Sequence, residues 1–175
     1  MIRDVLNGNT RSYAQIVDRY QSVVANLCYK LCGNRLDVEE VTQQVFVSLY
    51  TALPRFRFQS KLSTFIYRIT VNTVSKLLTQ DRRVVTQSQN DNFYTLSTDE
   101  TIERQIERRE RYEQLHRCID KLKHEQRTAL VLYSFEDFSY KEIAEIMQVS
   151  LAKVETLIFR AKRNLKDLIE QDKKY

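Results

Sequence analysis

Apolar residues recur at three- and four-residue intervals along most of this chain, which is the period of an α-helix with one buried face. Residues 10–32 carry the first such stripe: Tyr13, Ile16, Val17, Tyr20, Val23, Val24, Leu27, Cys28 and Leu31. We expect Gly33 and Asn34 to end this helix in a left-handed cap. A second helix is predicted from about Asp37 to Pro54, which stops it; its stripe is Val38, Val41, Val45, Leu49 and Leu53.

A third helix is expected from about residue 62 to residue 81, after an irregular aromatic and basic connector, RFRFQSK at 55–61. Its inward face has five apolar residues: Ile66, Ile69, Val74, Leu77 and Leu78. Arg68, Asn72 and Lys76 lie four residues apart, so they share an outer face of this helix.

Residues 84–99 lack a helical period and are rich in side chains that bond to their own backbone, which favours a linker. Ser97 and Glu100 then form a predicted capping box before helices at about 100–122 and 124–135. The pattern predicts an all-α protein of two small helical domains, residues 1–83 and 107–175. Residues 84–106 hold the linker and the start of the next helix.

The last segment, SYKEIAEIMQVSLAKVETLIFRAKRNL at 139–165, has two helical runs separated by a tight polar break. Ser139 with Glu142 predicts a capping box for the first run, and Ser150 can cap the second. Six positions match the spacing of a helix-turn-helix motif: Ile143, Ala144, Met147, Val149, Val154 and Leu157. One position departs from it, because Gln148 stands where the turn usually has glycine.

Composition agrees with helices, because the chain has only 2 glycines and 1 proline and therefore few turn residues. No apolar run reaches the roughly 18 residues of a membrane span. The N-terminus, MIRDVLNGNT, lacks the apolar core of a signal peptide, so a cytoplasmic protein is expected. The 3 cysteines are expected to be reduced core residues, since a metal site would need further ligands. A redox role for Cys28, Cys32 or Cys118 stays open.

Charge divides the chain in the same way. Residues 1–83 have 12 Lys and Arg against 6 Asp and Glu, a net charge of +6. Residues 84–106 have a net charge of −3, and residues 107–175 one of +2, which gives +5 in total. Two basic parts around an acidic middle indicate two modules that face polyanions. A helix-turn-helix serves to place its second helix in the DNA major groove.

The segments NRLDVEEVTQQVFVSLYTALPRF and SKLSTFIYRITVN resemble region 2 of bacterial RNA polymerase sigma factors of the extracytoplasmic-function (ECF) group. The segment FSYKEIAEIMQVSLAKVETLIFRAKRNL resembles region 4 of the same group. The resemblance covers nearly the whole chain. It implies a sigma factor that binds core RNA polymerase, reads the −35 and −10 promoter elements and promotes melting at −10.

The resemblance implies that the second helix docks on the clamp coiled coil of the polymerase β′ subunit. The implied contact residues are Asp37, Glu40, Gln43 and Gln44, and the family often has Glu at the position of Gln44. A further contact with the β flap is expected. An anti-sigma factor is an expected partner, and its identity and the inducing signal stay open.

The resemblance also implies two DNA-binding surfaces. The −10 region is expected to use Phe56, Phe58, Lys61, Phe65, Tyr67, Arg68, Asn72 and Lys76. Melted DNA needs stacking surfaces and cations, which these residues provide, although Phe65 stands where the family usually has Trp. Asn72 matches the family position near the extruded base.

The −35 element would be read by the last helix, through Lys153, Glu155, Thr156, Phe159, Arg160 and Arg163. The family commonly has a basic residue at the position of Glu155. Its carboxylate either accepts a hydrogen bond from a cytosine amino group or is a tolerated surface acid, and the −35 sequence stays open.

Two other functions compete with this interpretation. A stand-alone helix-turn-helix regulator would explain the last third, but not the acidic start of the second helix together with the aromatic-basic connector. An enzyme would need a phosphate loop, a nucleophile with a base, or a metal cluster, and the sequence offers none of these patterns. No cofactor is expected.

Overall fold

The computed structural model describes residues 2–80 and 102–172, and it describes their side chains except at 34 and 102–110. The regular structure of these residues is helical. No strand occurs within these ranges, which confirms the all-α prediction. The first half contains α1 (Ile2–Leu6), α2 (Thr10–Cys32), α3 (Val38–Ala52) and α4 (Leu62–Gln80). The second half contains α5 (Ile102–Asp120), α6 (His124–Ser134), α7 (Tyr140–Met147) and α8 (Leu151–Asp172).

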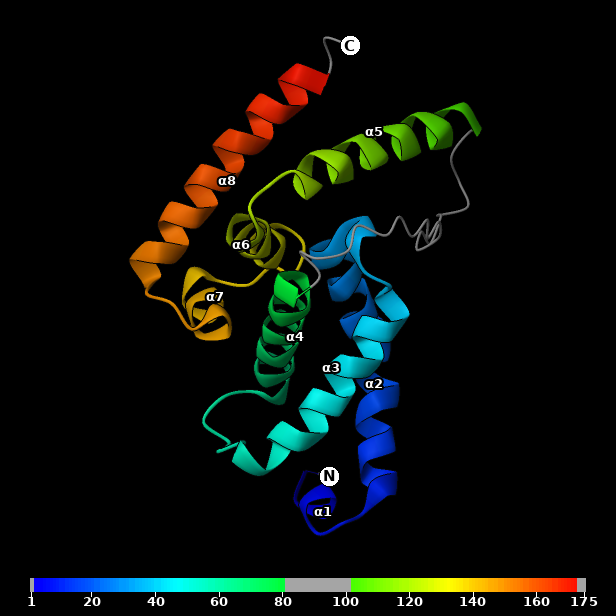
Figure 1. The fold of residues 1–175 in the computed structure, drawn as a ribbon, viewed down its shortest axis with the longest axis vertical. Coiled ribbons are helices and arrows are strands. Elements are labelled where there is room, and N and C mark those ends of the chain that lie inside the picture. The colour runs from blue at the N-terminus through cyan, green and yellow to red at the C-terminus, as the bar shows by residue number, and fades with distance from the viewer. Residues whose placement is uncertain (1, 81–101, 173–175) are drawn as a thin grey trace.

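Helices α2, α3 and α4 pack against one another, and the short α1 lies at the foot of α2 (Figure 1). The stripe predicted for α3 is buried along its whole length, from Val38 to Leu53. The stripe predicted for α2 is wrong at Val23, whose side chain is 38% exposed. Helix α1 was not predicted, because five residues are too few to show a period; Val5 anchors it in the core.

Short-range signals set the helix ends in the first half. The side chain of Asp37 accepts hydrogen bonds from the backbone N–H groups of Glu39 and Glu40, as an N-cap residue does. Pro54 lies in a 3₁₀ turn, Leu53–Arg55, that ends α3. Gly33 has a positive φ of 56° but a ψ of −141°, so the expected left-handed cap is wrong. Glycine is needed there because a Cβ atom would collide with the carboxylate of Asp120.

In the second half, α7 and α8 form the predicted helix-turn-helix, and α6 and α5 pack against α8. Ser139 and Glu142 make the predicted capping box. Gln148 closes the turn in the left-handed conformation, with φ 55° and ψ 45°, at a cost of about 1–2 kcal/mol that glycine would avoid. Ser150 accepts a hydrogen bond from the backbone N–H of Lys153 at 3.2 Å, as predicted for the cap of α8.

The two halves are in contact. Helix α4 packs against α7, and α2 packs against α6, so α4 lies between α3 and α7 in Figure 1. One continuous buried cluster includes Leu31 and Val74 from the first half and Val131 and Ile143 from the second. The sequence pattern gives no sign of this junction. The predicted linker and the Ser97–Glu100 capping box lie outside the described residues.

All 3 cysteines are buried free thiols, as predicted. Burial raises the pKa of Cys28 to about 12 and also raises the pKa of Cys32 and of Cys118. Among the helices described, none has the length and apolar character needed to cross a membrane.

Candidate nucleic-acid interface

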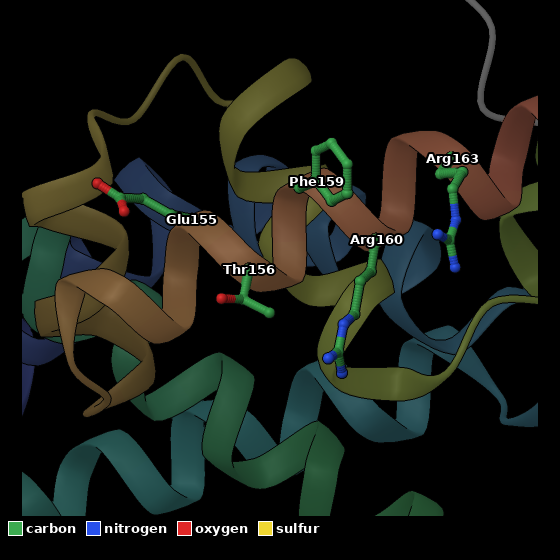
Figure 2. Close-up of a pocket in the computed structure, with 5 residues that line it drawn as sticks. All are labelled: Glu155, Thr156, Phe159, Arg160 and Arg163. Atoms are coloured by element: carbon green, nitrogen blue, oxygen red, sulfur yellow. The ribbon is translucent and has the colours of Figure 1, made fainter.

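The outer face of α8 forms an open pocket whose lining side chains follow successive turns of the helix (Figure 2). They are Glu155, Thr156, Phe159, Arg160 and Arg163. The opposite face of α8 is buried through Val154, Leu157, Ile158 and Ala161, which fixes the orientation of the outer face. Phe159 is 67% exposed, and the side chains of Arg160 and Arg163 extend in the same direction in Figure 2.

The other cations of α8 are engaged elsewhere. The Nζ atom of Lys153 lies 2.8 Å from Oε1 of Glu125 on α6. The Nζ atom of Lys162 lies 4.5 Å from the centre of the Tyr133 ring, and Lys166 pairs loosely with Glu170 at 3.9 Å. Arg160 and Arg163 are therefore the cations of the pocket itself. Lys153 lies at the edge of the pocket. The basic residues of α8, which form one run in the sequence, therefore lie on two faces of the helix.

Two phenylalanines of the connector, Phe56 and Phe58, form a cluster with Phe65 of α4. The ring of Phe56 lies 4.9 Å from the ring of Phe58 and 4.9 Å from that of Phe65, measured between centroids. Phe56 and Phe65 are buried, whereas Phe58 is 55% exposed. Phe58 also has a φ of 56°, which is costly for a bulky residue and occurs mainly where the surrounding structure imposes it. The connector thus holds one aromatic ring toward solvent.

The remaining residues predicted to contact the −10 element, which lie on α4 or just before it, differ in how exposed their side chains are. Asn72 and Lys76 are exposed, as is Lys61 just before the helix. The guanidinium of Arg68 lies 5.1 Å from the centre of the Phe65 ring. Tyr67 is buried, with its hydroxyl bonded to Glu136 of the second half at 2.5 Å. Tyr67 therefore does not offer its ring to a ligand in this conformation.

The predicted polymerase-binding residues lie on one exposed face of α3. Glu40, Gln43 and Gln44 are exposed, while the carboxylate of Asp37 caps the helix. Two apolar residues join this face that were not predicted: Val47, 58% exposed, and Tyr50, 45% exposed. Both lie off the buried stripe of α3, and an apolar residue off the stripe is the signal that could have identified them.

A buried arginine connects the two halves behind these surfaces. Arg127 on α6 has no exposed surface, and it donates hydrogen bonds to the carbonyl oxygens of Leu31 at 2.9 Å, Ile119 at 3.2 Å and Asp120. Its guanidinium also lies 3.1 Å from the Asp120 carboxylate. Burial lowers the pKa of Arg127 to about 10, against the opposing effect of Asp120, so it stays charged at neutral pH.

Two histidines lie near this arginine at the junction. The His116 ring packs on Tyr112 of α5 and Tyr29 of α2, with centroids 4.3 and 5.6 Å away. The Nε2 atom of His124 lies 2.6 Å from the hydroxyl of Ser75 on α4. Burial, followed by nearby cations that include Arg127, lowers the pKa of each from 6.5 to about 4. Both are therefore neutral in the folded chain.

We expect the free energy of unfolding to decrease as the pH falls from 6.5 toward 4. Because folding lowers both histidine pKa values, the unfolded chain takes up more protons in that range, and the stability present above pH 6.5 is lost. The raised pKa of Asp120 opposes this loss of stability, because its carboxyl group binds a proton more readily in the folded chain than in the unfolded chain. It is, however, one group against two histidines. Urea denaturation at pH 7.5 and pH 5 measures the effect.

The matched control for this pH experiment carries His116→Phe and His124→Asn, and its stability should change less between the two values of pH. A wild-type chain with the same stability at pH 7.5 and pH 5 would contradict the assignment of neutral histidines to the junction.

Two family models match successive parts of the chain. The first part contains the surfaces of α3 and α4, and the second contains the surface of α8. Sigma-70 region 2 matches residues 16–84, and Sigma-70 region 4 matches residues 112–165. The chain is 32% identical to the RNA polymerase sigma-H factor of Pseudomonas aeruginosa, over 93% of this chain and 88% of that protein. It is 31% identical to the ECF RNA polymerase sigma-E factor of Escherichia coli K12, over 97% of this chain and 93% of that protein.

Solved structures have a similar fold. CnrH, in complex with the cytosolic domain of CnrY, matches with a TM-score of 0.69 at 23% identity, over 98% of this chain and 96% of that one. The sigma factor RpoE from Bartonella quintana, in complex with the anti-sigma factor NepR, also matches with a TM-score of 0.69. That match has 17% identity and covers 91% of this chain and 98% of that one.

Proposed function

The chain belongs to the ECF group of sigma-70 factors, and from this membership we propose how its surfaces divide the recognition of a promoter. As a member of the group it is a promoter-specific initiation factor that binds RNA polymerase. The observation that carries the proposal is the order of three exposed faces, on α3, α4 and α8, within the two matched regions. The chain acts as a binding subunit in the cytoplasm and carries out no reaction of its own.

The face of α8 reads the −35 element. A helix-turn-helix inserts its second helix in the major groove and uses the N-terminal turns of that helix for base edges. Lys153, Glu155 and Thr156 lie in those turns and are assigned to base edges. Arg160 lies in the third turn and Arg163 follows it, so both are assigned to phosphates.

The connector and α4 bind and open the −10 element. Phe58 offers an exposed ring for stacking, and Lys61 and Lys76 offer cations for the backbone of the melted strand. Asn72 offers an amide to the edge of an extruded base. Phe56 and Phe65 are buried and pack behind the ring of Phe58, and Arg68 lies over the ring of Phe65. Tyr67, whose hydroxyl is bonded to Glu136, is assigned no DNA contact in this conformation.

The face of α3 docks on the β′ clamp coiled coil of core polymerase, and the second half contacts the β flap. Glu40, Gln43 and Gln44 supply polar contacts, with Val47 and Tyr50 as the apolar centre of the same face. This composition suits an interface, because aromatic side chains dominate the binding energy of many protein interfaces. An anti-sigma factor is a further partner in this proposal, and the sigma factor RpoE of similar fold was solved in complex with one, NepR.

A gel shift with and without core polymerase tests the function. The labelled probe carries a promoter selected by in vitro transcription with the reconstituted holoenzyme. We expect the chain to shift this probe strongly only when core polymerase is present. The Asn72→Ala variant should still form the complex but should slow melting at −10, measured by permanganate footprinting. A chain that binds the probe equally well without core polymerase would be a stand-alone regulator, and the proposal would fail.

Arg160→Ala should weaken binding to all −35 sequences alike and lower the salt slope of the binding constant by about one unit, because a phosphate contact is lost. Lys162→Ala is the matched control, since Lys162 lies over Tyr133 and outside the pocket, and it should have the smaller effect. Selection from a library randomised at −35 checks the role. Relaxed preference at one base pair, with affinity for the others kept, would show that Arg160 reads a base.

A further inference from the structure

The first two turns of α8 present hydrogen-bond acceptors to solvent, while their side-chain donors are engaged within the chain. The hydroxyl of Thr156 donates to the carbonyl oxygen of Ala152 at 2.9 Å, so its hydrogen is used and its oxygen can only accept. The ammonium group of Lys153 is held at α6, with Nζ 2.8 Å from Oε1 of Glu125. The third residue assigned to base edges is Glu155, whose carboxylate is an acceptor only.

The carboxylate of Glu155 forms no ion pair with any residue that the structure describes. Residues three and four positions away share its side of the helix, and none of them is charged. They are Leu151, Ala152, Ile158 and Phe159. Figure 2 shows the carboxylate directed away from the guanidinium groups of Arg160 and Arg163. An unpaired carboxylate therefore lies on the surface that we assign to DNA.

The surroundings of Glu155 make its carboxylate sensitive to the base that it meets. It is the one acid among the five residues that line the pocket. The ring of Phe159, four residues on, is 67% exposed. When DNA covers this face, the ring and the base edges displace water from the carboxylate. A charged group that loses water without gaining a hydrogen bond is costly, so a base pair that offers no donor is disfavoured.

The major groove of DNA offers two kinds of donor, the N4 amino group of cytosine and the N6 amino group of adenine. Guanine presents acceptors at N7 and O6, and thymine presents an acceptor at O4, so both repel a carboxylate. Adenine has its N7 acceptor beside the N6 amino group, and a carboxylate that spans the two atoms is repelled by one of them. Cytosine presents its amino group alone. The carboxylate therefore favours cytosine over the other three bases.

We propose that Glu155 is a specificity-determining residue, which selects cytosine at one base pair of the −35 element by accepting a hydrogen bond from the N4 amino group. This inference rests on the proposed function, because it names the base that one side chain of the α8 face selects. The competing interpretation is a tolerated surface acid, which repels the phosphates of every sequence alike and leaves base preference unchanged.

Selection from a promoter library tests the inference with the full chain and core polymerase. The library is the promoter obtained by in vitro transcription, randomised at −35. Wild-type chain should enrich cytosine over guanine by about tenfold or more at one base pair that loses this preference in Glu155→Ala. The other −35 positions should keep their preferences. Glu170→Ala removes the same charge from an exposed residue about 22 Å further along α8, and this matched control should keep every preference.

Two further substitutions should redirect the preference at the same base pair. Glu155→Gln provides a donor as well as an acceptor, so it should favour adenine, whose N6 and N7 atoms it can contact together. Glu155→Arg provides donors only and should favour guanine through O6 and N7. Gel shifts of the holoenzyme on the four promoters that differ at that pair should show about a tenfold preference for the new base over cytosine. Because Glu155 is exposed, each variant should keep the circular dichroism spectrum of the wild type.

A cytosine preference that persists in Glu155→Ala or in Glu155→Arg would overturn the inference, as would an affinity that rises equally for all −35 sequences in Glu155→Ala. A wild-type chain that enriches a −35 sequence without any such cytosine would also overturn it, while the proposed function would stand. If the wild-type holoenzyme enriched no −35 sequence at all, the proposed reading of −35 by α8 would fail, and the inference would fail with it.

Discussion

Replacing Gln43 and Gln44 together with lysine should lower the affinity for core polymerase by about 100-fold or more while the chain stays folded. Both side chains are exposed on the α3 face that we assign to the β′ clamp, so the core does not depend on them. Each new ammonium group would be desolvated at the interface without a partner, at a cost above about 1 kcal/mol. Pull-down of core polymerase measures the binding, and circular dichroism measures the fold.

Val41→Asp is the contrasting variant for this experiment. Val41 is 3% exposed on the inner face of the same helix, so an aspartate there would bury an unpaired charge and unfold the first half. The lysine double variant should instead retain its circular dichroism spectrum. If it still captured as much polymerase as the wild type, the assignment of the α3 face would be wrong.

Arg127→Met should lower the free energy of unfolding by about 3–5 kcal/mol, the range observed when one partner of a buried ion pair is removed. The substitution leaves the Asp120 carboxylate and the carbonyl oxygens of Leu31 and Ile119 without the guanidinium that they share. Methionine fills similar volume, so the loss reports the polar contacts rather than a cavity. Urea denaturation at neutral pH measures it.

Arg117→Met provides the control for Arg127. Arg117 is exposed on α5, and its substitution should change stability by no more than about 0.5 kcal/mol. Equal effects of the two substitutions would show that the buried network contributes little. Arg127→Lys should be intermediate, because an ammonium group keeps the charge but cannot bond to several carbonyl oxygens in the fixed directions of a guanidinium.

Much of the fold could be predicted because its signals are local. The stripe of α3, the cap of Ser150 and the capping box of Ser139 each depend on residues within about four positions of one another. The turn of the helix-turn-helix was placed correctly even though Gln148 replaces glycine, because the surrounding apolar positions fix its register. Helix α1 and the exposure of Val23 escaped prediction, because each depends on packing against other elements.

The candidate site was predictable to a different degree at each surface. The α8 pocket contains five of the six residues expected to read −35, while Lys153 pairs with Glu125 at its edge. On α3, Val47 and Tyr50 extend the expected face. Near α4, the sequence indicates an aromatic and basic surface but cannot show that Tyr67 is turned toward the second half.

Helix period and capping act over a few residues, and therefore the sequence specifies which segments are helical, where most of them end and which face of each is apolar. How the two halves meet depends on contacts between residues far apart in the chain. Tyr67 and Glu136 are 69 positions apart, and Arg127 and Leu31 are 96 apart. Their hydrogen bonds depend on atoms brought within about 3 Å by the packing of whole helices. No local pattern encodes such a distance, and therefore the burial of Tyr67 and Arg127 appears only in the folded chain.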